Sequence, residues 1–568
     1  MQTETQNERG KISVKVLLIL IMILGTACVN TEKKESSVDE AAGSVLPYIQ
    51  KTNGVKQLMV DGNPFIMIAG EVMNSSSSSL QHMEPIWQHL KELHVNTVLL
   101  PISWQQFEPE EGEFNYTLID GLIENAHKHN IRLVILWFGS WKNTRSDYAP
   151  AWVKMDWERF PRMIGEDGEI MRAVANFSAT ALEADKKAYV KLMQRIKEVD
   201  THHTVLMMQI ENEVGIKRSA RDHSPAANAL FEDKVPAELI RYIRDNLDEI
   251  KPILRNAYIH NGSKAEGSWE EVFGKSLDTD EMFMAWNYAK YINELSIAGK
   301  AIHPIPTLVN ACAADSIRKP GDWFSGGPNY RMIDIYQAGA PDIDLIAIDN
   351  YQIGDFNKKC RQFIHNGNPL FIPEACAPWL RDTHSAAAKA FFTIGHHKAI
   401  CFSPFGIDHE MYHADDHPII NAYKVLNDLM PLIASAQVEQ KVNAFMELDA
   451  STSKPFIIGG YKFTPSYSRP TDTNITGYGM VIQTGEDEFI IAGNGFDLDF
   501  QSIDENRPYA EMLLKEEVEF VDGKWLGRRV LNGDEYSLQF PAKPFGLVEN
   551  TVPGEISVHK VTLFRRSI

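Results

Sequence analysis

Short apolar runs alternate with amphipathic stretches through the middle of the chain. Apolar runs at 65–71, 95–103, 132–138, 204–212, 306–311, 344–350, 369–375 and 399–405 are each followed by a stretch with helical periodicity. A continuous apolar run of this length predicts a parallel strand that is buried on both faces. Eight such strand-helix units predict an α/β fold, the (β/α)8 TIM barrel.

The pattern changes after Gln437. Short alternating segments at 455–463, 479–483, 488–492, 518–520, 535–539 and 556–564 are separated by Gly or Asp turns. They predict a small all-β, sandwich-like domain. A hairpin turned at Asp61-Gly62 is expected just before the first barrel strand. We therefore expect a catalytic barrel over residues 51–437 and a C-terminal β-domain over 438–568.

The N-terminus has the pattern of an export signal. Three basic residues precede the apolar run 16–24, and small residues then lead to Cys28. The run is too short for a typical transmembrane helix and fits a secretory signal. Cys28 in this setting resembles a bacterial lipoprotein processing site. The resemblance implies a signal peptide over 1–28, a lipidated Cys28, a tether over 29–50 and anchoring to a cell-envelope membrane, whereas simple secretion with Cys28 removed is the alternative.

The amino-acid composition limits the kinds of partner that the protein is expected to bind. The formal net charge of -20 argues against nucleic acid or an anionic membrane surface as a partner, leaving the lipid anchor as the expected membrane contact. The other four cysteines lack metal-site spacing and are expected to be buried free thiols: Cys312, Cys360, Cys376 and Cys401. No metal and no cofactor is expected.

Polar residues stand where two of the buried strands end. The run 204–212 finishes in Glu211, Asn212 and Glu213, and the run 369–375 delivers Glu374. Carboxylates at such places are costly unless they line a site. The carboxyl ends of barrel strands form the catalytic face, so the two glutamates are predicted to meet there as a paired-carboxylate enzyme site.

These residues lie in motifs that resemble a known family. Gln-Ile-Glu-Asn-Glu-Val-Gly (209–215) resembles the acid/base segment of clan A glycoside hydrolases, in which Asn-Glu ends strand four and the nucleophile ends strand seven. The blocks at 61–65, 70–71, 107–109, 112–114, 136–143, 367–374 and 402–406 resemble glycoside hydrolase family 35, in particular bacterial β-galactosidases with a small C-terminal β-domain.

The resemblance implies a retaining mechanism. Glu213 would be the general acid and base and Glu374 the nucleophile, with carboxyl groups roughly 5 to 5.5 Å apart. Glu213 would need to be protonated and Glu374 ionised, with Tyr351 holding the nucleophile. Glu211 shares the strand face of Glu213 and is the alternative acid/base.

Further residues at strand ends are candidates for substrate binding. The resemblance implies that Asn212 bonds the sugar 2-hydroxyl; Asn310 is placed at the same face. Glu71 would bind sugar hydroxyls or form a structural ion pair. Aromatic rings that could stack on galactose are those of Trp104, Trp137, Trp141 and Trp379, of which Trp137 and Trp379 are the first candidates.

Together these features predict a retaining exo-β-galactosidase that releases terminal galactose from a β-galactoside glycan. Long loops at 139–180 and 215–277 are expected to close the pocket around one terminal sugar. Two alternatives remain. Another clan A exo-glycosidase would act on β-linked arabinopyranose or fucose, and a surface glycan-binding lipoprotein would not catalyse.

Overall fold

The computed structural model describes residues 45–313, 318–351, 355–413, 415–448, 450–467, 476–521, 524–531, 533–535, 537–540 and 556–567. The predicted signal peptide, Cys28 and the tether up to residue 44 lie outside this range. Within it, every helix is too short or too polar to cross a membrane.

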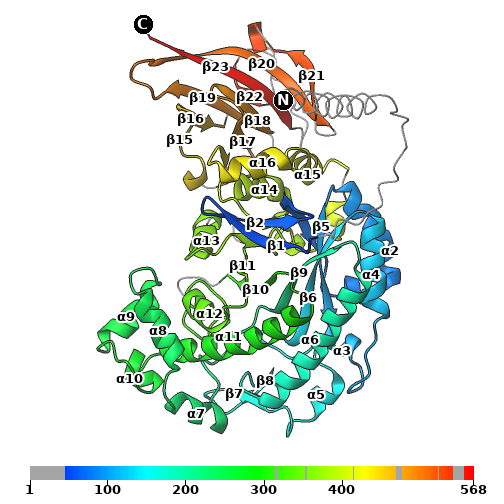
Figure 1. Cartoon of the computed structure of the whole chain (residues 1–568), viewed down its shortest axis with the longest axis vertical. Coiled ribbons are helices and arrows are strands. Elements are labelled where there is room, and N and C mark those ends of the chain that lie inside the picture. Colours follow the sequence, from blue (N-terminus) through cyan, green and yellow to red (C-terminus); the bar gives the residue numbers. More distant parts are fainter. Residues whose placement is uncertain are drawn as a thin grey trace, which may run out of the picture. The chain divides into compact units, whose positions relative to one another are not determined.

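Eight parallel strands form a barrel, which confirms the predicted fold (Figure 1). The strands are β4 (Met67–Glu71), β5 (Thr97–Ser103), β6 (Arg132–Lys142), β9 (Val205–Asn212), β10 (Thr307–Cys312), β11 (Leu345–Asp349), β12 (Phe371–Ile372) and β13 (Cys401–Phe402). Their order is β11-β10-β9-β6-β5-β4-β13-β12. The ring closes between β11 and β12, where the Asn350 N–H donates to the Glu374 carbonyl at 2.9 Å.

Helices follow the strands on the outside of the barrel. The main ones are α2 (Leu80–Glu92), α4 (Thr117–Lys128), α6 (Ala179–Val199), α11 (Leu277–Ile302), α12 (Ile333–Gly339), α13 (Phe356–Phe363), α14 (Ala386–Gly395), α15 (Pro418–Asp428) and α16 (Met430–Val438). Ser79 caps α2 by accepting a hydrogen bond from the His82 N–H. Pro431 lies in the first turn of α16, a position that suits proline, and a new helix starts there directly after α15.

The two long loops contain structure of their own. The first carries α5 (Ala151–Met155) and the hairpin of β7 (Arg162–Ile164) and β8 (Ile170–Val174), and α3 (Trp104–Phe107) follows β5. The second carries α7 (Pro225–Glu232), α8 (Ala237–Asp245), α9 (Pro252–His260) and α10 (Trp269–Phe273). Pro252 begins α9 as a helix separate from α8.

Apolar side chains fill the barrel interior, and a small sheet closes its amino-terminal end. This sheet consists of β1 (Tyr48–Thr52), β2 (Val55–Val60) and β3 (Asn63–Phe65). Its Leu58 and Val60 join the interior cluster. The predicted hairpin is confirmed: Asp61 and Gly62 have φ of 50° and 78°, as a tight type I′ turn requires.

The C-terminal strands form two antiparallel sheets, as predicted. One has the order β14-β17-β18-β23-β20-β21 and the other β15-β16-β19-β22. The strands are β14 (Val442–Met446), β15 (Phe456–Ile458), β16 (Tyr461–Ser466), β17 (Tyr478–Gln483), β18 (Glu488–Asn494), β19 (Phe496–Ser502), β20 (Tyr509–Val521), β21 (Lys524–Val530), β22 (Gln539–Phe540) and β23 (Ser557–Arg566). Apolar residues of both sheets share one core. Residues 45–568 form one compact unit, so the predicted boundary at 437 stays a prediction.

Candidate active site

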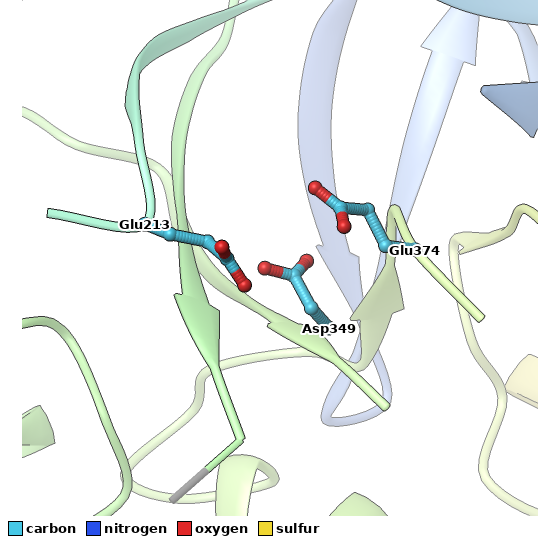
Figure 2. Close-up of side chains that lie close together, drawn as sticks. All are labelled: Glu213, Asp349 and Glu374. Carbon is cyan, nitrogen blue, oxygen red and sulfur yellow. The ribbon is translucent and has the colours of Figure 1, made fainter. Parts of the chain in front are cut away.

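Glu213 and Glu374 meet at the carboxyl ends of the barrel strands, as the sequence predicts (Figure 2). Glu213 directly follows β9 and Glu374 lies just after β12. Carboxyl oxygens of these two residues and of Asp349 all lie within 4.8 Å of one another. Glu213 and Glu374 are almost wholly buried, at 5% and 4% exposure, and Asp349 is fully buried. The structure therefore builds one carboxyl cluster from three barrel strands.

An irregular strand end directs Glu213 into the cluster. Glu211 and Glu213 have φ of 60° and 46°, a left-handed conformation that is uncommon for non-glycine residues and is often found at functional sites. Gln209 steadies this segment by donating to the Glu211 carbonyl at 3.2 Å and to Asn212 Oδ1 at 2.9 Å. Asn310 Oδ1 accepts the Glu213 N–H at 3.0 Å. The bent backbone is therefore held by side-chain amides.

Tyr351 and Asn212 hold Glu374. The Tyr351 hydroxyl donates to Glu374 Oε2, which confirms the predicted contact, and Asn212 also hydrogen-bonds this carboxyl. Burial raises the pKa of Glu374 to about 7, and the charge of Glu213 adds to the rise; Lys142, Tyr351 and Asn212 oppose it. The nucleophile candidate was expected to be ionised at neutral pH. Burial thus outweighs the groups that favour the charged form, and ionisation of Glu374 in the reacting site stays a prediction.

Asp349 and Lys142 complete the cluster, and neither was predicted. Asp349 ends β11 and is fully buried. Lys142 ends β6, and its ammonium lies 4.9 Å from the centre of the Phe138 ring. Burial lowers the pKa of Lys142, but four carboxyl groups, those of Glu374, Glu213, Glu71 and Asp349, raise it above the ordinary value. A signal existed for Asp349, since it is an acidic residue at the end of the apolar run Leu-Ile-Ala-Ile (345–348).

Glu71 lies at the same face of the barrel as predicted. It is fully buried, and neither carboxyl oxygen has a hydrogen-bond partner among the described residues. Burial and the charge of Glu374 raise its pKa well above the ordinary value, which Lys142 partly offsets. Within the described chain Glu71 forms no structural ion pair, so its acceptor capacity is available to a ligand.

Glu211 is not an alternative acid/base. Its carboxyl accepts the N–H groups of Ser140 and Trp141 at 3.0 and 2.7 Å and contacts Asp185, away from the carboxyl cluster. A Cβ on Gly139 would approach Glu211 Oε1 to 2.8 Å, so this packing requires glycine there. Glu211 is therefore structural: it ties the end of β9 to the end of β6.

Trp137 does not line the site, so its assignment to substrate binding is wrong. It is fully buried, donates from Nε1 to Asp185 at 2.8 Å and packs on Phe107 and Tyr189 between the barrel and its helices. Trp104 and Trp141 are buried likewise, with indole N–H groups bonded to Glu108 and to the Val174 carbonyl. All three rings belong to the core outside the barrel, Trp104 from α3 and the other two from β6, where side chains alternate between the two faces.

Asn310 also has a different role from the predicted one. Its Oδ1 accepts the Glu213 N–H, and its Nδ2 donates to Asn212 Oδ1 at 3.2 Å and to Asp349 Oδ2 at 2.9 Å. The amide is thus occupied by the protein and 2% exposed. Asn310 therefore positions the acidic groups, and its role in substrate binding stays a prediction.

Trp379 remains the candidate aromatic platform. It lies in a 3-10 turn, Pro378–Leu380, that follows Glu374, and it is 59% exposed. Its ring centre is 6.1 Å from that of Tyr351 and 5.3 Å from that of Phe405. The exposed ring therefore stands next to the residue that holds Glu374.

The three clustered carboxyl groups are close enough to hold a metal ion. Lys142, however, interacts electrostatically with all three carboxyl groups and already provides a positive charge beside them. A second positive charge would be repelled in this buried setting. The arrangement fits proton transfer better than metal binding.

Comparison with known proteins finds two families that match parts of the chain. Residues 75–279 match the family described as glycoside hydrolase 42, β-galactosidase. Over these residues the chain is similar to a family of glycoside hydrolases. The expected assignment to family 35 is wrong, because the matching family is 42; the Asn-Glu pair and the strand-seven glutamate occur throughout the clan and do not separate its families. Residues 419–541, from α15 to β22, match a domain of unknown function (DUF5597).

Curated relatives are distant. A β-galactosidase of Arthrobacter sp. is 22% identical over 316 residues, covering 53% of this chain and 41% of the relative. The β-galactosidase GalA of Bacillus licheniformis is 24% identical over 131 residues, covering 22% and 18%. The chain thus spans less than half the length of the curated relatives it matches.

The solved structures that the comparison matches to this chain include two β-galactosidases. The one from Bacillus circulans sp. alkalophilus is 14% identical, with a TM-score of 0.44 over 65% of this chain and 57% of its own. The one from Rahnella sp. R3 is 15% identical, with a TM-score of 0.43 over the same shares.

Proposed function

We propose that this protein is a retaining exo-β-galactosidase that releases terminal β-linked galactose from oligo- or polysaccharides. The observation that carries the proposal is the pair Glu213 and Glu374, whose carboxyl oxygens lie within 4.8 Å of each other on different barrel strands. Inverting enzymes need about 6.5–9.5 Å between these groups to seat a water, whereas retaining ones have about 5–5.5 Å. The match of residues 75–279 to a β-galactosidase family supports the choice of sugar.

In the first step Glu374 attacks the anomeric carbon and the glycosidic C–O bond breaks. The leaving oxygen takes the proton of Glu213, and a galactosyl ester forms on Glu374. Tyr351 and Asn212, which donate to the carboxyl of Glu374, orient it for attack. Asn212 also lies beside Glu213 in the chain, within reach of both reacting groups.

In the second step Glu213 acts as the base. It takes a proton from water, the water oxygen bonds the anomeric carbon, and Glu374 leaves as a carboxylate. Two displacements on opposite faces of the ring restore the β-configuration. The retained configuration therefore follows from the short carboxyl separation.

The sugar hydroxyls have partners in the same cluster. Glu71 offers two acceptor oxygens without partners in the described chain, and Lys142 offers ammonium donors. Trp379 offers an exposed ring for the apolar face of the sugar. These contacts suit galactose, but β-arabinopyranose and β-fucose share its ring hydroxyls and differ at C6, so matched aryl glycosides of the three sugars are compared.

The decisive experiment follows hydrolysis of an aryl β-galactoside by proton NMR. We expect β-galactose as the first product and no turnover by Glu374→Ala, since no glycosyl ester can form. An α-configured first product contradicts the assignment of the nucleophile. Glycan binding without any hydrolysis by the wild type favours the non-catalytic binding alternative.

Exo action is part of the proposal, supported by the structured loops at 139–180 and 215–277, which enlarge the catalytic face of the barrel. Chromatography of an early oligosaccharide digest should show galactose alone. Early internal fragments contradict exo action. We also propose, from the N-terminal pattern, that the protein is exported and lipid-anchored through Cys28.

A further inference from the structure

A third carboxyl group lies inside the site and is not accounted for by the two-glutamate mechanism. Figure 2 shows the Asp349 side chain between those of Glu213 and Glu374. Asp349 is the last residue of β11 and is fully buried. The retaining mechanism needs one acid/base and one nucleophile, so Asp349 needs a role of its own.

Asn310 fixes Asp349 and Glu213 together. Its Nδ2 donates to Asp349 Oδ2 at 2.9 Å while its Oδ1 accepts the Glu213 N–H at 3.0 Å. The other oxygen, Asp349 Oδ1, is buried and has no donor among the described residues. A carboxyl oxygen of Asp349 lies within 4.8 Å of one of Glu213, so the two carboxyl groups are close enough to act on each other directly. Two carboxyl groups can bond each other only if one of them carries a proton.

The surrounding charges also favour a shared proton. Burial, Glu374 and Glu213 raise the pKa of Asp349 well above its ordinary value. The titratable groups that face the pair come from several strand ends and the loop after β9: Glu71, Lys142, Lys217, Cys312, Tyr351 and Glu374. Like charges this close do not all ionise together.

We propose that Glu213 and Asp349 hold one proton between them, and that Asp349 is a positioning residue that keeps this proton on the acid/base until the leaving group takes it. The proposal rests on the proposed glycosidase function. Before reaction Glu374 is charged and the pair carries one negative charge. After proton transfer the pair carries two, but Glu374 has become a neutral ester.

The total charge of the three groups is therefore constant through the step. While Glu374 is ionised, its negative charge keeps the proton on the pair, so Glu213 is ready to act as the acid. Once Glu374 is a neutral ester, the pair loses the proton readily, so Glu213 can then act as the base. In the second step the pair regains a proton from water as Glu374 regains its charge. Asp349 thus couples the acid/base strength of Glu213 to the state of the nucleophile.

The test is Asp349→Asn, which keeps the shape and an oxygen for Asn310. Without the second carboxylate Glu213 loses its proton at lower pH, so the basic limb of the kcat/KM profile should move down by at least about one pH unit. Hydrolysis of a galactoside with a poor leaving group should fall by about 10²-fold, and that of an activated aryl galactoside far less. Thermal unfolding shows whether Asp349→Asn is folded. If it is not, Asp349→Ala is tested in its place.

Infrared difference spectroscopy gives a readout that is independent of turnover. The wild type at neutral pH should show a protonated carboxyl band that Asp349→Asn reduces. An unmoved basic limb with equal losses for both leaving groups, or an unchanged band, overturns the shared proton. Absence of any galactoside hydrolysis by the wild type overturns the proposed function instead, while the infrared test still decides the state of the pair.

Discussion

The ionisation of Glu374 sets how the activity falls at low pH. Its pKa of about 7 results from burial and the charge of Glu213, opposed by Lys142, Tyr351 and Asn212. A nucleophile must be ionised to attack, so activity is present above this pKa and falls as the pH drops through it. Lys142 keeps the carboxylate form populated, and its removal should raise the pKa of Glu374 further.

Lys142→Met therefore shifts the acidic limb of the kcat/KM profile to higher pH. We expect a shift of about one unit, with activity at pH 6 reduced by about tenfold and activity at high pH much less affected. The matched control is Lys128→Met, at the exposed end of α4, which should keep the wild-type profile. An acidic limb that stays in place shows that Lys142 does not act on the nucleophile.

The role of Glu213 as the acid is tested by comparing substrates that differ in their leaving group. Glu213→Ala should cost about 10²–10⁴-fold with alkyl galactosides and far less with activated aryl galactosides, whose departure needs little protonation. Added azide should then form β-galactosyl azide, detected by mass spectrometry, because a small anion enters in place of activated water. Equal losses for both classes of substrate mean that another group is the acid.

Among the elements, β6 shows how strand alternation sorts residues between two environments. Leu136 and Phe138 point into the barrel interior, whereas Ile135, Trp137 and Trp141 join the outer core. The pairing of β6 with β9 shifts register between Trp137 and Lys142. The irregular end of the strand brings the Lys142 side chain into the carboxyl cluster.

Two tryptophan substitutions separate binding from stability. Trp379→Ala removes an exposed ring next to Tyr351 and should raise KM by about tenfold, with kcat and the melting temperature little changed. Trp137→Ala removes a buried ring together with its hydrogen bond to Asp185, so it should lower the free energy of unfolding by about 3–5 kcal/mol. The measurements are steady-state kinetics and chemical denaturation. A wild-type KM in Trp379→Ala excludes the ring from sugar binding.

At the scale of the whole molecule, the prediction that the protein is exported and lipid-anchored depends on the sequence that precedes the described residues. Cys28→Ser should remove the lipidation site and so release the protein from the membrane fraction or block its processing. The assay is fractionation of cells that express the wild type and the variant. A variant that partitions with membranes like the wild type contradicts the lipid anchor.

The sequence by itself determined the eight barrel strands, the two-sheet domain and the pairing of Glu213 with Glu374. These features depend on local periodicity and on the rule that parallel strands place their carboxyl ends at one face. The contact between Tyr351 and Glu374 was expected from the resemblance to clan A glycoside hydrolases, and the structure contains it.

The tertiary structure alone decided what each polar or aromatic residue at a strand end does. Trp137, Glu211 and Asn310 were all placed near the site by position in the chain, yet they face the outer core, β6 and the other acidic groups respectively. Asp349 and Lys142 entered the site without having been predicted. A shift of one position along a strand turns a side chain to the other face, and the strand-end irregularities that set this direction depend on contacts between distant segments.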